Sequence, residues 1–415
     1  MLTKFFKFIL IIVLYQSPLY SKSKTMNDFN SRYLSNYFSG IVAYDNKDNS
    51  KALKFFQSSK ILIERHNLYL KKYVYTLVLE GRFQQAINEV KQNLTKKNSD
   101  FYEAHLILAL DSIKKKNYKK SGEHLKESYR FINNDKFALI ITEMLKQYLY
   151  VFEENKIPTK KGEFGNFSFV NEVFQKCYLG NKSTKAYFEN LINNKDSGRA
   201  KNTDHSRYIF FYINYLIENN KHQDAKEIST NLEYLKSSLL ISQGKKWIED
   251  EKQEEFQKVF SCRNSSDIIG EFFFLVASLY SSQNDYKRSN FYLNVAHFLN
   301  PKFKFNLSLL ADNYYINKNY TKTLKVLKNF NEKDEFYYWF KLKKEAQIIS
   351  KQKSKEVSMD FINSKFKRIK NPSIKTIFDI ANFNKNAKKY KVAINYYDKI
   401  LSKININSDL YAEIL

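Results

Sequence analysis

Six histidines are the first residues to test for chemistry, because imidazole is both a frequent metal ligand and a general base near neutral pH. They are spread along the chain, and no two have the spacing of metal ligands on one helix face. No HExxH motif occurs. The six are His66, His105, His124, His205, His222 and His297. The sequence therefore predicts no metal site, and we expect His105 to pack inside a repeat.

The remaining candidates for chemistry are equally incomplete. Gly162 and Gly165 in KKGEFGN lack the further glycines and the preceding strand of a phosphate-binding loop. The serine-rich stretch at 261–267 supplies hydroxyls without a base in fixed register, and no Cys–His pairing is visible. Glu254 and Glu255 fit a solvated helix face. We therefore predict a non-enzymatic protein with no cofactor.

The elements that would have to position any site repeat along the chain. Tyr286 follows the polar turn QND, and Tyr320 follows NKN 34 residues later. Residues in the same relation to a polar turn are 49, 83, 118, 286, 320, 354 and 390. Regular return at this interval predicts one structural unit per interval.

Small residues accompany these positions at fixed offsets. Nine residues earlier stand Gly40, Ala109, Ala277, Ala311 and Ala381. Three residues later stand Ala52, Ala86, Ser121, Ser289, Thr323, Val357 and Ala393. Small side chains let two helices approach closely, and apolar spacing of three and four predicts an amphipathic helix on each side of the turn. We expect Ala311 and Ala381 to be buried.

This pattern resembles the tetratricopeptide repeat (TPR) family, a helix–turn–helix unit of 34 residues. Ala52, Ala86 and Ala393 match its alanine after the turn, and its final proline is kept at Pro301. The family's tryptophan position is degenerate, with Leu70, Phe273 and Leu307. The resemblance implies an all-α fold, a right-handed α-solenoid of TPR-like helix–turn–helix repeats. Only nine glycines and four prolines in 415 residues also disfavour a turn-rich β fold.

The domain organisation follows from where the repeat is clear. We predict a signal peptide at 1–23, N-terminal TPR-like repeats at 32–135, degenerate helical repeats at 136–266, and C-terminal TPR-like repeats at 267–415. In the degenerate part, helix pairs are expected from 166–192, 206–232 and 235–260, after a helix at 137–152. Segments 155–166 and 193–204 have the composition of loops.

The two ends of the chain carry further expectations. A positively charged start, an apolar run at 8–15 too short to span a bilayer, and Ser21 and Ser23 before a cut are typical of a secretory signal peptide. The alternative is a buried first helix. A new helix is expected at 408–415, and without a polar capping helix after it the last solenoid unit would be incomplete.

Export bears on the cysteines and on the charge. Only Cys177 and Cys262 are present, and their separation suggests two buried free thiols, because adjacent Cα atoms are not expected across more than two solenoid units. Lys and Arg number 69 against 43 acidic residues, a net charge of +26. The lysines are dispersed and arginine is scarce, which favours a compositional origin over nucleic-acid recognition.

The resemblance implies that partners bind in the concave groove formed by the first helix of each unit. The residues expected there are Tyr37, Tyr44, Tyr75, Phe274, Asp312, Tyr315, Phe378 and Asn382. The alternative for several of them is packing against neighbouring helices. Lys375 and Lys385 would stand at one end of the groove and could accept a carboxylate.

Three functions remain open on this basis. The first is a protein-binding scaffold of the periplasm or cell envelope. The second is a binder of anionic or exported polysaccharide in an envelope assembly, with a membrane surface as a further anionic partner. The third is a regulatory solenoid for a catalytic domain outside this chain. Nucleic acid ranks lowest, because export would separate the protein from it.

Overall fold

A computed structural model describes residues 31–64, 66, 68–94, 100–133, 135–159, 164–193, 206–232, 235, 237–404, 411 and 414. All regular elements in these ranges are helical. The expected signal peptide, most of the loop at 193–204 and nearly all of the expected helix at 408–415 lie outside the described residues. In the described part, no helix is both long and apolar enough to cross a membrane.

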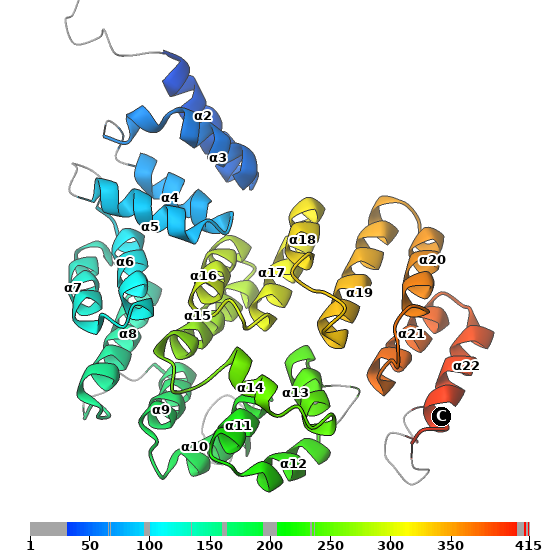
Figure 1. The fold of residues 1–415 in the computed structure, drawn as a ribbon. Helices are drawn as coiled ribbons and strands as arrows, with labels where there is room; N and C mark the ends of the chain where they lie inside the picture. The colour runs from blue at the N-terminus through cyan, green and yellow to red at the C-terminus, as the bar shows by residue number, and fades with distance from the viewer. Residues whose placement is uncertain are drawn as a thin grey trace, which may run out of the picture.

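The N-terminal helices form successive hairpins from α2 to α8 (Figure 1). Their bounds are α2 Ser31–Asp45, α3 Asn49–Ser58, α4 Tyr69–Leu79, α5 Phe83–Asn93, α6 Tyr102–Lys114, α7 Tyr118–Ser128 and α8 Lys136–Glu154, with short 3-10 turns at Lys60–Leu62 and Tyr129–Phe131.

The middle of the chain contains the helices expected there. They are α9 Asn166–Leu179, α10 Thr184–Asn193, α11 Arg207–Glu218, α12 His222–Thr230, α13 Leu239–Glu249 and the short α14 Glu254–Val259. Ala225, in the small position of α12, is completely buried.

The C-terminal helices again form hairpins. They are α15 Ser265–Ser282, α16 Tyr286–Leu299, α17 Phe305–Ile316, α18 Tyr320–Leu327, α19 Glu335–Gln352, α20 Lys355–Phe366, α21 Ile374–Asn386 and α22 Tyr390–Leu401. Each consecutive pair packs together, so the protein is an all-α solenoid of TPR-like helix–turn–helix repeats.

The repeat has its origin in the turn between the two helices. Tyr286 is the first residue of α16, as Phe83 is of α5 and Tyr320 of α18. Two residues before Tyr286, Asn284 has a φ of 62°, a left-handed conformation that ends the preceding helix. Asp285 then caps the next helix, its carboxylate accepting a hydrogen bond from the Arg288 backbone N–H at 3.1 Å. A fixed turn between helices of similar length produces the fixed interval.

One predicted repeat position is wrong by a residue. The second helix α20 begins at Lys355, because Ser354 is its N-cap and accepts a hydrogen bond from the Val357 backbone N–H at 3.2 Å. Val357, expected in the buried small position, is therefore 44% exposed. Ser358 takes that position, and its hydroxyl donates to the Ala346 carbonyl at 2.7 Å.

The close helix approach expected at the small positions is confirmed. Ala311 and Ala381 have no exposed surface. At Gly40, a Cβ atom would lie 2.9 Å from the Phe56 ring. Contact this short leaves no room for a side chain, so α2 and α3 depend on the missing methyl group to meet.

The C-terminal hairpins fold back onto the N-terminal ones (Figure 1). Helix α16 packs against α4 and α5, and α15 packs against α6 and α9. The ring of Phe298 in α16 stacks on Phe83 with centroids 4.1 Å apart, and the Tyr314 hydroxyl donates to the Leu79 carbonyl at 3.1 Å. One continuous hydrophobic core therefore runs from α2 to the start of α19, and a second core holds α19 to α22. The domain boundaries at 136 and 267 stay predictions.

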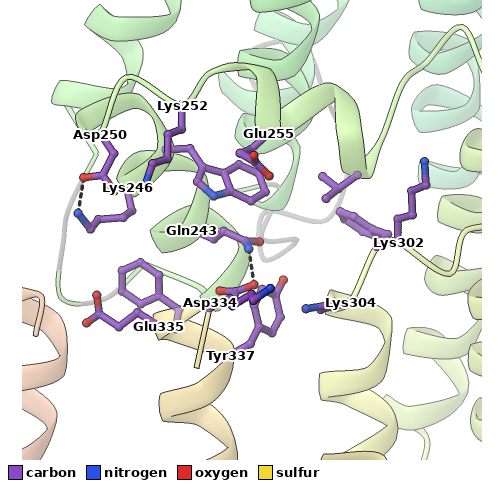
Figure 2. A pocket seen from close by; sticks show the side chains of 15 residues that line it. Gln243, Lys246, Asp250, Lys252, Glu255, Lys302, Lys304, Asp334, Glu335 and Tyr337 are labelled. Carbon is purple, nitrogen blue, oxygen red and sulfur yellow. Dashed lines mark hydrogen bonds and ion pairs between the residues drawn. The ribbon is translucent and has the colours of Figure 1, made fainter. Parts of the chain in front are cut away.

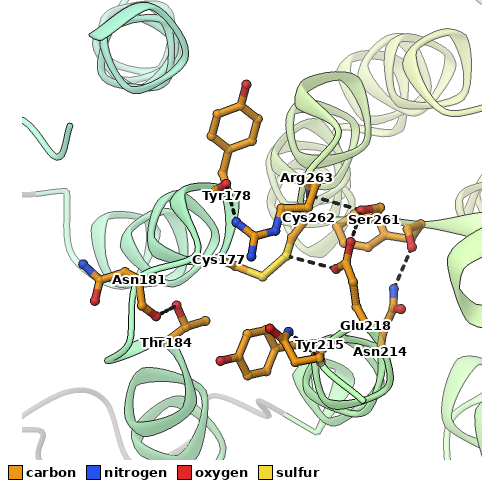
Figure 3. The surroundings of a disulfide bond; sticks show 12 residues. Cys177, Tyr178, Asn181, Thr184, Asn214, Tyr215, Glu218, Ser261, Cys262 and Arg263 are labelled. Carbon is orange, nitrogen blue, oxygen red and sulfur yellow. Dashed lines mark hydrogen bonds between the residues drawn. A yellow bond between two sulfur atoms is a disulfide. The ribbon is translucent and has the colours of Figure 1, made fainter. Parts of the chain in front are cut away.

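The prediction of free thiols is wrong, because Cys177 and Cys262 form a disulfide with Cα atoms 5.8 Å apart (Figure 3). Cys177 lies in α9 and Cys262 lies just before α15. The chain turns back between them through α10 to α14, which brings the start of α15 against the end of α9. A straight solenoid would have kept these segments apart. The Arg263 guanidinium strengthens the same junction by donating to the Tyr178 carbonyl at 2.8 Å.

Candidate binding site

Of the three N-terminal residues expected in the groove, Tyr37 and Tyr44 are buried and Tyr75 is partly buried. Tyr37 is 4% exposed and stacks on Tyr69 with ring centroids 5.2 Å apart. Tyr44 is also buried, and the Lys287 ammonium of α16 lies 3.3 Å from its ring centre. The inner surface of the first hairpins is thus packed against the chain itself.

Tyr75 shows what covers that surface. Its ring lies 4.6 Å from the ring of Phe291 in α16, and its hydroxyl donates to Glu103 at 2.9 Å. Burial raises the pKa of the Tyr75 hydroxyl well above its usual range, and the neighbouring Glu103 carboxylate acts in the same direction. Tyr75 is therefore a neutral hydrogen-bond donor in the interface between the N-terminal and C-terminal hairpins.

The C-terminal hairpins present a different inner face, which we define as the surface of α15, α17, α19 and α21. Asp312 and Tyr315 of α17 both contact Lys344 of α19 on this face. Lys344 was not among the residues predicted from the sequence. The Lys344 ammonium lies 2.7 Å from the Asp312 carboxylate and 4.8 Å from the centre of the Tyr315 ring. Lys344 follows Asp312 by about one repeat, and this spacing is the only feature of the sequence from which the contact could have been predicted.

Two depressions lie on either side of this ion pair. The first, of about 410 Å³, lies between α15 and α17 and combines apolar side chains with serine hydroxyls. Its lining includes Phe274, Ser278, Phe305, Leu309, Asp312 and Ile316. Ile316 is 55% exposed, which is high for an isoleucine and offers an apolar contact to a partner.

Phe274 is held in place by a second residue that the sequence did not reveal. The Arg207 guanidinium carbon lies 3.8 Å from the Phe274 ring centre, and the same guanidinium forms a bidentate pair with Glu271 of α15 at 2.6 and 2.8 Å. Glu271 is buried, which raises the pKa of its carboxyl group against the opposing effect of Arg207. This pair fixes α11 to α15 and gives the first depression a rigid wall.

The second depression, of about 360 Å³, lies between α19 and α21 and is richer in amides and charges. Asn382 lines it and accepts a hydrogen bond from the Tyr397 hydroxyl at 2.7 Å. Phe378 is partly buried, with its ring 6.0 Å from that of Tyr397. Asp379 accepts from the Trp339 indole at 2.8 Å and pairs with Lys343 at 2.5 Å. The lining suits hydrogen bonding to a peptide backbone.

Lys375 has partners within the chain. Its ammonium donates to the carbonyls of Leu235 and Ser237 at 2.6 and 2.8 Å, which ties the segment before α13 to α21. Burial lowers the pKa of Lys375, and the nearby Asp379 opposes that shift. The expectation that Lys375 could receive a partner's carboxylate stays a prediction, but its protein contacts would have to be replaced.

A third hollow, of about 470 Å³, joins α13 and α14 to the start of α19 (Figure 2). Figure 2 shows Gln243 of α13 directed at Asp334, the N-cap of α19, with the amide donating to the carboxylate at 2.8 Å. Burial raises the pKa of Asp334 to about 6, against the effect of Lys304. Because Gln243 and Asp334 bond to each other across the hollow, we interpret it as a joint between helices.

The histidines and acidic residues do not assemble a metal site in the described part of the chain, where no three His, Cys, Asp or Glu side chains gather. His105 is 3% exposed, forms a close contact with Asp100 and stacks on Phe131 with centroids 5.7 Å apart. The expectation that His105 packs inside a repeat is confirmed.

No protein-family model matches the chain, and no curated protein matches it in sequence. Among solved structures it is similar to the TPR domain of P58(IPK), at 10% identity over 92% of this chain and 96% of that one, with a TM-score of 0.26. It is also similar to yeast Tom70, at 11% identity over 89% and 91% of the two chains (TM-score 0.24), and to a chain of the APC/C hetero-tetramer Cut9–Hcn1, at 10% identity over 94% and 91% (TM-score 0.28).

Proposed function

We propose that this protein is a non-enzymatic scaffold that binds a segment of another protein across the inner face of α15, α17, α19 and α21. The observation that supports it is the pair of depressions flanking the Asp312–Lys344 ion pair. In the N-terminal hairpins the corresponding surface is filled by α16.

The chemistry of the two depressions describes the partner. An apolar side chain would enter the first depression beside Leu309 and Ile316. Backbone amides or polar side chains would bond to Gln347 and Asn382 in the second. A central buried anchor with polar contacts around it is a common arrangement at protein interfaces.

We further propose that the protein is exported to the periplasm or cell envelope. The pattern at 1–23 and the Cys177–Cys262 disulfide support this, because disulfides persist in oxidising compartments.

The proposal is tested by placing a photo-crosslinking amino acid at Ile316 in the full chain and irradiating intact cells. Val42 on α2 is the matched control, since the two side chains are 55% and 59% exposed. We expect Ile316 to cross-link a discrete protein that Val42 does not. The purified partner should then bind the wild type more tightly than a Leu309→Asp variant. Equal capture at both positions, or none, would contradict the proposal.

A further inference from the structure

A separate cleft forms where three inter-helix turns meet. The turns between α2 and α3, α15 and α16, and α17 and α18 line a cleft of about 680 Å³, which we call the turn cleft. Asn49, Tyr286 and Tyr320, the first residues of α3, α16 and α18, all lie in its wall. They occupy equivalent places in three repeats, and the return of the C-terminal hairpins to the N-terminal ones brings them together.

The electrostatics of the turn cleft favour an anion. Three helices of eight or more residues direct their N-termini toward it, and each N-terminus carries partial positive charge. Asp48 and Asp285 also line it, but their carboxylates accept hydrogen bonds from the backbone N–H groups of Lys51 and Arg288 in their own helices.

Four lysines line the turn cleft; Lys322 pairs with Glu80, and the other three are not neutralised in this way. Among the described residues, Lys47, Lys287 and Lys318 form no ion pair with a carboxylate, and the Lys47 ammonium instead donates to the Asn317 amide oxygen at 3.2 Å. Burial lowers the pKa of Lys287, and Lys72 and Lys47 add repulsion, against the opposing effect of Asp45 and Asp285. A bound anion would relieve the repulsion among these ammonium groups.

A buried acceptor indicates that the ligand also carries hydroxyl groups. Asn49 is 6% exposed, and its Oδ1 atom has no hydrogen-bond partner among the residues that the structure describes. An unpaired buried amide oxygen is costly, and a ligand hydroxyl could donate to it. Asn290, Asn317 and Asn319 add further amides to the wall, and Tyr320 adds a phenol.

We propose that the turn cleft binds an acidic sugar, with the anionic group between Lys47 and Lys287 and a sugar hydroxyl on Asn49 Oδ1. This site is separate from the two depressions of the inner face, although Tyr286 borders both the turn cleft and the first depression. If the turn cleft binds no acidic sugar, the protein-binding proposal is unaffected.

Calorimetric titration of the full chain with D-glucuronate, glucose 6-phosphate, glucose and inorganic phosphate tests the inference. We expect at least one acidic sugar to bind about tenfold or more tightly than both glucose and phosphate. The acidic sugar would make both a charged hydrogen bond to lysine and a hydroxyl hydrogen bond to Asn49, whereas each of the other two probes would make only one of these contacts. The tighter of the two acidic sugars identifies the anionic group. Equal binding of phosphate would show a simple anion site, and no binding of any probe would show that there is no site; either result overturns the proposal.

Two cleft variants and one control variant locate the site. Asn49→Asp places negative charge at the unpaired acceptor and should reduce acidic-sugar binding about tenfold or more, and Lys287→Gln should do the same by removing a cation. Lys226→Gln, on the distant helix α12, is the matched control and should bind as the wild type does. Thermal melts identify any cleft variant that has lost its fold. Lys318→Gln then takes the place of that variant in the binding measurements. Unchanged affinity in folded cleft variants would contradict the assignment.

Discussion

The N-terminal and C-terminal hairpins share the same repeat, but the inner surface is covered in the first and open in the second. Tyr75 in α4, Asp312 in α17 and Asn382 in α21 each follow the buried small or apolar position of their first helix. In α4 that place is covered and packs against the core, because the Phe291 ring of α16 lies 4.6 Å from the Tyr75 ring. In α17 and α21 the same place lines a depression. An inward-facing position is therefore covered or left open according to what the chain folds against it.

The strongest test of this comparison is to remove the residue that fills the N-terminal inner surface. Phe291 is 1% exposed. Phe291→Ala should lower the free energy of unfolding by about 3–5 kcal/mol, because it leaves a cavity against Tyr75. Ile316→Ala on the open inner face should change it by no more than about 0.5 kcal/mol. Urea denaturation measures both, and similar losses would mean that the two surfaces do not differ as described.

Removal of the disulfide tests the fold-back that creates the difference. The Cys177→Ala, Cys262→Ala variant should lose about 2–4 kcal/mol of stability, because the bond closes a long loop between α9 and the start of α15. Hydrogen exchange should increase at the contacts of α15 with α6 and α9, and it should not change in α21 and α22. Uniform loosening of all hairpins, or an unchanged stability, would argue against a role for the bond in the fold-back.

The packing common to both regions is tested at Ala311, which is completely buried. Ala311→Leu should destabilise the protein by about 1–3 kcal/mol through overpacking between neighbouring helices. Val357→Leu, at a position 44% exposed, serves as the control and should leave the melting temperature nearly unchanged. An unaffected Ala311→Leu protein would show that α17 is less tightly packed than described.

The smallest expected effect concerns the joint between the middle and C-terminal repeats. The pKa of Asp334 in the folded protein, about 6, lies above its ordinary value of 3.8, so the folded state binds this proton more tightly than the unfolded state does. The contribution of Asp334 to stability should therefore rise by about 1–2 kcal/mol as the pH falls from 7 through 6 toward 4. Because Asp267 also titrates near 6, the measured quantity is the difference between the wild type and Asp334→Asn. A difference that does not vary with pH would contradict the assignment.

Much of the fold could be predicted because it depends on neighbouring residues. Asp285 caps α16 and Asn284 takes the left-handed conformation within a few residues of Tyr286. Such turn chemistry is visible in the sequence and sets the 34-residue interval. The error at Ser354 had a local cause as well, since a serine N-cap was mistaken for the first residue of the helix.

The candidate site was less predictable, because its members meet only through packing between repeats. The sequence placed Asp312 and Tyr315 on one inner helix, but it did not identify Lys344 as their neighbour or Arg207 as the neighbour of Phe274. Residues that face inward share one periodic signal whether they end in a core or on a surface. The sequence pattern therefore could not show that Tyr75 would be covered and that Asp312 would line an open depression.

The sequence by itself determined the helical hairpins, their turns and the small residues at which helices meet, because each depends on contacts within one or two repeats. Only the tertiary structure decided that α16 fills the N-terminal inner surface, that Cys177 meets Cys262, and that three turns enclose the turn cleft. Small rotations between successive repeats add up over the length of the solenoid. That sum, which no single repeat encodes, determines which distant segments come into contact.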